Sequence, residues 1–134
     1  MRLYLADYVA EAETKARKQF ADTIIFITDI NHVKTKVNLL DLICICKDPT
    51  DSSRKTLFFG KNSIVRIKAT WPVVHSILDK HKLDYFVTNK KEHLVMKNQI
   101  EKYSRPYLFL KNFSLKIEVV KDRLHRFEEW LEEG

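Results

Sequence analysis

A nearly continuous apolar run from Leu39 to Cys46 places the strongest constraint on the fold of this chain. The run is too short for a comfortable helix, so it predicts a buried strand. Segments on both sides, such as 33–37, alternate apolar and polar side chains with a period of two, as half-exposed strands do. With only 2 glycines and 3 prolines, the turns must be made mainly by Asn, Asp, Ser and Lys. The chain is therefore expected to be mainly β, with short helices.

The same patterns predict the remaining elements of the chain. We expect strands over residues 23–27, 33–37, 39–46, 55–59, 63–68, 84–87, 92–95, 99–103, 107–110 and 115–119. Thr70 and Pro72 suit the cap and the first turn of a middle helix over residues 71–80. A C-terminal helix is expected from about Lys121, with an apolar side formed by Leu124, Phe127 and Leu131.

The N-terminal residues follow a different period. Residues 3–20 predict a helix because apolar side chains recur three and four residues apart, at Leu5, Tyr8, Val9, Ala12, Ala16 and Phe20. Such a helix could pack on the rest of the chain, pair with a second copy, or be the remnant of a linker. We therefore divide the chain into an N-terminal helix over residues 1–21, for linkage or dimerisation, and one domain over residues 22–134.

Composition fits one globular domain of 134 residues, with 45% hydrophobic and 31% charged residues. No run of about 18 apolar residues occurs, so no membrane partner is expected. The N-terminus carries acids within its apolar stretch, which a signal peptide does not. Cys44 and Cys46 point to one face of the predicted strand and lack ligand spacing, which favours two free thiols. These observations predict a cytoplasmic protein.

The net charge of +6 is unevenly distributed along the chain. Residues 47–68 carry six basic and two acidic residues, and residues 80–126 carry twelve basic and five acidic residues. The tail from Phe127 carries four glutamates and no basic residue. Concentrated positive charge is typical of proteins that bind polyanions such as nucleic acid.

No residue constellation predicts catalysis. The five histidines are scattered without a pair at metal-ligand spacing, at His32, His75, His81, His93 and His125. Asp41, Asp48 and Asp51 are close in sequence but lack the base or nucleophile of a catalytic set. There is also no Gly-rich phosphate loop. We therefore expect a protein that is not an enzyme and that uses neither a metal nor another cofactor.

Two sequence stretches carry a family resemblance. Near the end of the chain, Leu110-Lys111-Asn112-Phe113 is followed by an alternating segment over 115–119 and by Lys121-Asp122-Arg123-Leu124. Upstream, residues 85–96 form two short strands around a basic turn, followed by Asn98-Gln99-Ile100-Glu101. These stretches, with the order of elements over roughly residues 22–131, resemble the LytTR family of bacterial transcription regulators. The resemblance implies elongated antiparallel sheets with short helices.

The resemblance further implies sequence-specific binding of double-stranded DNA, with loops rather than a recognition helix entering the major groove. Its three contact positions fall at Ser53, Lys91 and Lys121. With their neighbours, the implied DNA-binding residues are Ser53, Arg54, Lys55, Asn89, Lys90, Lys91, Lys121 and Arg123. Cations at a helix N-terminus cost about 0.3–1 kcal/mol, which suggests another use for Lys121 and Arg123, such as phosphate binding; for Arg123 the alternative is a solvated helix face. The expected partners are therefore double-stranded DNA, a second copy joined through the N-terminal helix, and a sensor or receiver chain of the kind that serves a response regulator.

Three substitutions separate this chain from the family pattern. Lys90-Lys91-Glu92 stands where the family has His-Arg-Ser, and Phe113 stands where it has glycine. Lys121 replaces an arginine and offers a point charge where arginine offers a bidentate fork. These changes motivate an alternative, in which a LytTR-like scaffold serves as a non-catalytic protein-interaction module.

Overall fold

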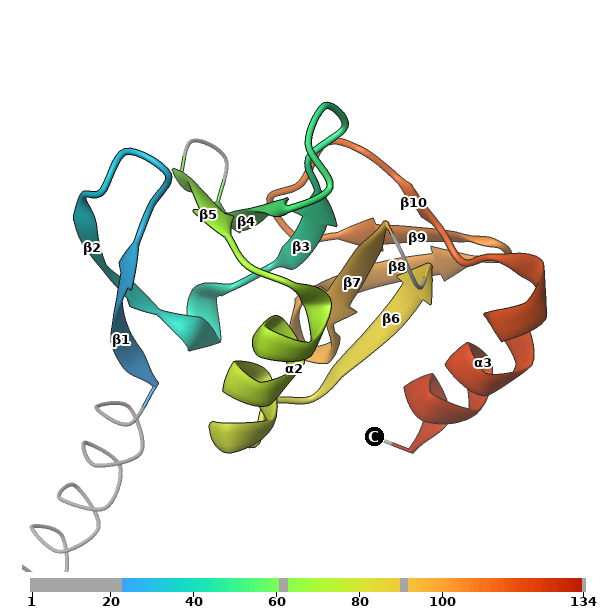
Figure 1. Cartoon of the computed structure of the whole chain (residues 1–134). Coiled ribbons are helices and arrows are strands. Elements are labelled where there is room, and N and C mark those ends of the chain that lie inside the picture. The colour runs from blue at the N-terminus through green and yellow to red at the C-terminus, as the bar shows by residue number, and fades with distance from the viewer. Residues whose placement is uncertain (1–22, 61–62, 90–91, 134) are drawn as a thin grey trace, which may run out of the picture.

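Three antiparallel sheets and two α-helices make up the part of the chain that the computed structural model describes, residues 23–60, 63–89 and 92–133 (Figure 1). The predicted helix over residues 1–21 lies outside this part. The strands are β1 (Ile24–Thr28), β2 (Lys34–Asn38), β3 (Cys44–Lys47), β4 (Arg54–Gly60), β5 (Ser63–Lys68), β6 (Tyr85–Asn89), β7 (His93–Met96), β8 (Ile100–Ser104), β9 (Tyr107–Leu110) and β10 (Ile117–Glu118). The helices are α2 (Trp71–Lys80) and α3 (Leu124–Glu132), with 3-10 turns η1 (Leu39–Asp41), η2 (Lys97–Gln99) and η3 (Lys121–Arg123).

The central sheet has five strands in the order β5-β4-β3-β7-β6. Its middle strand, β3, pairs with β4 on one side and β7 on the other, so that Ile45 lies opposite both Leu57 and Leu94. Successive side chains of a strand point to opposite faces. Ile45 therefore contributes to one face of the sheet, while Cys44 contributes to the other. Burial on both faces explains why the sequence of β3 reads as a continuous apolar run.

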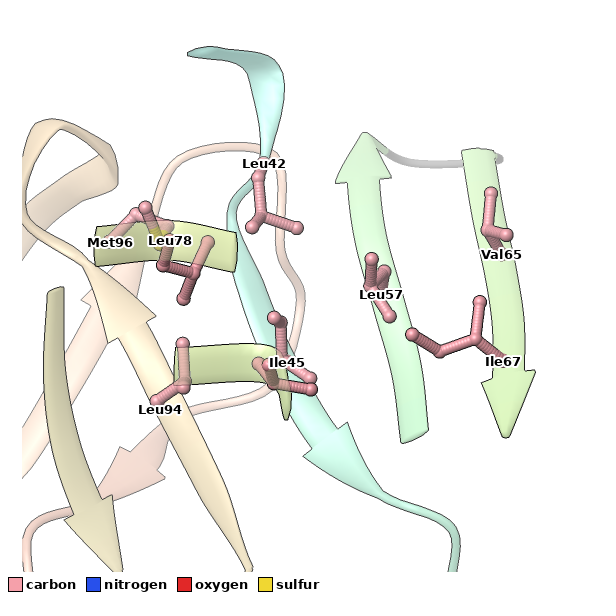
Figure 2. Close-up of a cluster of buried hydrophobic side chains, with 9 residues drawn as sticks. Leu42, Ile45, Leu57, Val65, Ile67, Leu78, Leu94 and Met96 are labelled. Carbon is pink, nitrogen blue, oxygen red and sulfur yellow. The ribbon is translucent and has the colours of Figure 1, made fainter. Parts of the chain in front are cut away.

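Helix α2 covers the first face of the central sheet and closes one core (Figure 2). Val74 and Leu78 of the helix are only 2% and 1% exposed. The β1–β2 hairpin forms a separate two-stranded sheet, and its Ile27 and Val37 pack against the same core. The buried members of this cluster are Leu42, Ile45, Leu57, Val65, Ile67, Val74, Leu78, Leu94 and Met96.

The second face is covered by the β10-β9-β8 sheet and by α3. Phe127 of α3 is fully buried, and its ring lies 5.3 Å from Phe86, 5.0 Å from Tyr103 and 5.6 Å from Trp130. Trp130 is partly buried and packs against this cluster through its contact with Phe127. Cys44 and Cys46 both face this cluster as free thiols, as the sequence predicted.

The structure corrects the sequence-based prediction at four elements. Residues 39–46 do not form one strand, because the Asn38 side chain accepts a hydrogen bond from the Leu40 amide and caps the 3-10 turn η1. The predicted 115–119 strand is reduced to Ile117–Glu118, and the last helix begins with η3 before α3. Thr70 occupies the cap position of α2 but makes no capping hydrogen bond with its side chain.

Candidate nucleic-acid interface

Three loops that are far apart in sequence meet at one edge of the central sheet. The Lys47 amide donates to the Glu92 carbonyl at 2.7 Å, which joins the end of β3 to the β6–β7 turn. The Val120 amide donates to the Thr88 carbonyl at 3.1 Å, which joins the segment before η3 to the end of β6. We call this region, formed in the described part of the chain by residues 48–54, Asn89, Glu92 and residues 120–123, the loop edge. It unites the three segments that the family resemblance implies for DNA contact.

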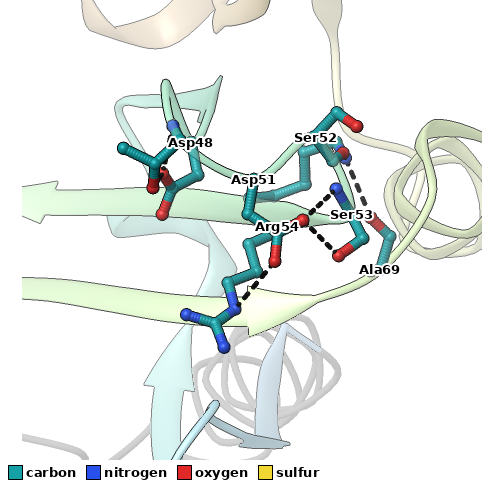
Figure 3. A network of polar contacts seen from close by, with 8 residues as sticks. Asp48, Asp51, Ser52, Ser53, Arg54 and Ala69 are labelled. Carbon is teal, nitrogen blue, oxygen red and sulfur yellow. Dashed lines mark hydrogen bonds and ion pairs between the residues drawn. The ribbon is translucent and has the colours of Figure 1, made fainter.

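The first loop of this edge is held by its own carboxylates (Figure 3). Asp51 accepts hydrogen bonds from the amide and the hydroxyl of Ser53 at 2.9 and 2.6 Å. The Nε of Arg54 lies 3.4 Å from the same carboxylate group. Asp48 accepts from the amide and the hydroxyl of Thr50 at 2.9 and 2.8 Å. The hydroxyl groups of Ser53 and Thr50 therefore both donate within the loop.

These hydrogen bonds favour the charged form of both carboxyl groups. Donation from Ser53 lowers the pKa of Asp51, and donation from Thr50 lowers the pKa of Asp48. Both side chains are thus ionised at neutral pH beside the single exposed cation of this loop, Arg54. Residues 48–54 carry one more negative than positive charge, so this loop alone does not attract phosphate.

Lys55 differs from its neighbour Arg54 because strand alternation turns it toward α2. The side chain is 2% exposed, and its ammonium donates to the carbonyls of Ser52 at 2.7 Å and Ala69 at 3.0 Å. The Nζ also lies 5.1 Å from the centre of the Trp71 ring. Burial lowers the pKa of Lys55. Because its donors are directed into the protein, Lys55 is left out of the contact surface proposed below, although the sequence assigned it to DNA.

The second loop is the β6–β7 turn. Asn89 ends β6 with a half-buried side chain, and its carbonyl accepts from the Glu92 amide at 3.1 Å. Glu92 also forms a 3.0 Å ion pair with Lys47 of β3. Lys90 and Lys91 lie outside the described residues. The assignment of these two lysines to DNA contact therefore stays a prediction.

The two cations of the third segment have different surroundings. Lys121 is exposed at the start of η3. Arg123 turns inward, where its Nε donates to the Val87 carbonyl at 2.5 Å and its guanidinium lies 5.0 Å from the centre of the Phe86 ring. Arg123 therefore anchors η3 to β6, whereas Lys121 faces solvent.

Two further cations near this edge were absent from the sequence assignment. Arg66 and Lys68 are exposed on β5, and Lys68 lies directly opposite Arg54 in the β4–β5 register. The sequence contained a signal for this pair of exposed cations. Alternation over residues 63–68 places residues 64, 66 and 68 on one face, and two of these three are basic. Sequence alone did not show that this end of β5 reaches the loop edge.

His93 near this edge contacts a neighbouring strand side chain. Thr88 Oγ1 lies 2.5 Å from His93 Nδ1, and burial lowers the pKa of His93. Within the described part of the chain, no three His, Cys, Asp or Glu side chains are grouped closely enough to hold a metal ion. No helix of these residues is long and apolar enough to cross a membrane.

Comparison with known proteins defines the class of fold. Neither a protein-family model nor a curated protein matches this chain. Among solved structures, it is similar to a LytTr DNA-binding domain from Bacillus cereus, assigned to a methyl-accepting/DNA response regulator. The two share 10% sequence identity with a TM-score of 0.60, over 81% of this chain and 96% of that one. The described domain therefore has the LytTR-type fold, as the sequence resemblance predicted.

Proposed function

We propose that this protein is a transcription-regulator domain that binds double-stranded DNA in a sequence-specific manner through the loop edge. The observation that carries this proposal is the meeting of three separate loops at one edge of a LytTR-type fold. The similar solved domain is described as DNA-binding. A line of loops at one edge is suited to entering a groove, whereas neither α2 nor α3 is part of the proposed contact surface.

Phosphate contact in this proposal falls to the exposed cations. Lys121 supplies a point charge next to the end of β6, and Lys90 and Lys91 supply two more charges by their place in the sequence. Contact with phosphates fixes position and orientation but carries no sequence information directly. The net charge of +6 favours association with any duplex.

Base readout in this proposal falls to Arg54. Asp51 holds its Nε at 3.4 Å, and a guanidinium has five N–H donors, so others are left for a base edge. An arginine held in place loses less side-chain freedom on binding, and its fork matches O6 and N7 of guanine. The acid beside it would disfavour a phosphate at the same position. This combination suits a base contact better than a phosphate contact.

A salt titration with a fluorescently labelled pool of random duplexes tests the proposal. The logarithm of affinity should fall linearly with the logarithm of salt concentration, by about 0.9 for each phosphate neutralised. Selection from random duplexes should then enrich a common sequence. Absence of salt-sensitive binding would overturn the proposed function.

A protein-interaction module remains the second candidate because large apolar side chains are exposed away from both cores. Phe26 of β1 is 66% exposed and Leu115 is 67% exposed. Light scattering on the full chain and on a chain lacking residues 1–20 distinguishes the two functions when set beside the DNA titration. A dimer that is lost on truncation, without DNA binding, would support the second candidate. A second copy and a sensor or receiver chain stay proposals.

A further inference from the structure

The outward face of β5 carries two cations whose surroundings differ from those of most other cations near the loop edge. Val65 and Ile67 of this strand point into the first core and are each 7% exposed. Arg66 and Lys68 alternate with them and are exposed on the opposite face of the sheet. In the described part of the chain, neither side chain forms an ion pair.

Most other cations near the edge are already engaged. Lys47 is paired with Glu92 at 3.0 Å, and Arg54 is paired with Asp51 at 3.4 Å. Lys55 and Arg123 donate to backbone carbonyls. A cation with a protein partner must give up that interaction, or share it, before it can neutralise a phosphate. Exposed cations without such partners are therefore the better phosphate ligands, a description that fits Lys121 as well as the β5 pair.

The β5 pair lies at the opposite end of the same sheet edge from Lys121. The Ala69 amide donates to the Ser53 carbonyl at 3.1 Å, which fixes the end of β5 beside the first loop. Lys121 follows Val120, which is bonded to the end of β6. The strand order β5-β4-β3-β7-β6 puts four interstrand spacings between these ends, or about 19 Å at about 4.8 Å each. This span exceeds the width of the major groove, about 12 Å.

We propose that Arg66 and Lys68 form a phosphate-binding cluster that flanks the loop edge on the β5 side, opposite Lys121. The loops between the two positions would enter the groove while cations at both ends contact the phosphates that border it. This inference rests on the proposed DNA-binding function and adds two residues to its contact surface.

The test compares two double variants of the full chain that lose the same charge. Arg66→Gln/Lys68→Gln removes the β5 pair. Lys80→Gln/Lys82→Gln removes one exposed lysine at the end of α2 and one in the turn that follows it. The control pair is remote because the Lys97 amide bonds to the Asp84 carbonyl at 3.0 Å, at the end of β7 that lies away from the loop edge. Circular dichroism and thermal melting verify that both variants are folded.

Affinity for the random duplex pool is measured across salt concentrations for both variants and the parent. For the β5 variant, the slope should become shallower by about 1.8, which corresponds to about 60-fold weaker binding at about 0.1 M salt. The control should keep the parental slope. An unchanged slope in the β5 variant, or equal losses in both variants, would overturn the cluster while leaving DNA binding intact. A parent chain that does not bind DNA would overturn the proposed function and the cluster together.

Discussion

The first loop and the third segment of the loop edge both bring cations to the same border of the central sheet, but they use them differently. In the first loop, Lys55 is buried and bonded to two carbonyls, and Arg54 is held by Asp51. In the third segment, Lys121 is exposed while Arg123 serves as the anchor. The comparison shows that the position of a cation in a loop does not decide whether it is available to DNA. The availability of a cation depends on the face of the strand to which its side chain points and on the acceptors nearest to it.

Substitution of Lys55 should have the largest effect, and it should be on stability. Lys55→Met keeps the aliphatic stem but leaves the part-buried carbonyls of Ser52 and Ala69 without their donor, at up to about 1–3 kcal/mol in total. Urea denaturation measures the loss. The matched control, Lys121→Met, should stay within about 0.5 kcal/mol of the parent. Equal stability of the two variants would remove the distinction drawn between the two cations.

Substitution of Lys121 should show the reverse pattern. Lys121→Gln should make the salt slope of DNA binding shallower by about 0.9, equivalent to about 8-fold weaker binding at about 0.1 M salt. The midpoint of thermal unfolding should not move, because this side chain is exposed. Arg123→Gln is the informative comparison, since it should reduce stability through loss of the bond to the Val87 carbonyl. A Lys121 variant with the parental slope would contradict the assignment.

Substitution of Asp51 should have a smaller effect on DNA binding, and this effect distinguishes base contact from phosphate contact at Arg54. Asp51→Asn removes a negative charge from the loop, so affinity for random duplexes should rise by a few-fold. Arg54 would lose its ionic partner, and discrimination between selected and random duplexes should fall by part of the about 1–3 kcal/mol that a bidentate pair supplies. Competition binding with both duplex types measures the two effects. Weaker binding to both would mean that the carboxylate only maintains the shape of the loop.

The smallest expected effect is a pH dependence of stability at His93. Burial lowers its pKa from the ordinary value of 6.5, so the unfolded chain binds a proton more readily than the folded one. The free energy of unfolding should therefore be at its full value above pH 6.5 and decrease as the pH falls below 6.5. Urea denaturation of the parent and of His93→Gln at several pH values between 7 and 5 measures this dependence. An equally steep decrease in both proteins would exclude His93 as its source.

Much of the fold follows from the sequence because local patterns and tertiary contacts agree. A period of two marked strands such as β2 and β5, and the continuous apolar run marked β3, the middle strand of the central sheet. The 3-10 turn at Leu39–Asp41 was missed because apolar residues lie on both sides of Asp41, whereas the bend depends on the hydrogen bond that the Asn38 side chain accepts from the Leu40 amide. Hydrophobic period alone does not contain that information.

The candidate site was less accessible to sequence reasoning. The resemblance located its three loops, and the fold brings them to one edge, but the state of each side chain depends on non-local acceptors. Lys55 bonds to Ala69, 14 residues away, and Arg123 bonds to Val87, 36 residues away. Arg66 and Lys68 were missed for the related reason that strand order, not local sequence, places β5 at the end of the sheet.

The central position of β3 and β7 has a consequence for how the domain loses its structure. Both strands supply side chains to both cores: Ile45 and Leu94 to one, Cys44 and Val95 to the other. Neither core can therefore unfold without the loss of packing contacts in the other core. Unfolding of the domain should be a single cooperative transition, with equal calorimetric and van't Hoff enthalpies. A duplex bound at the loop edge would then raise the melting temperature of both cores together.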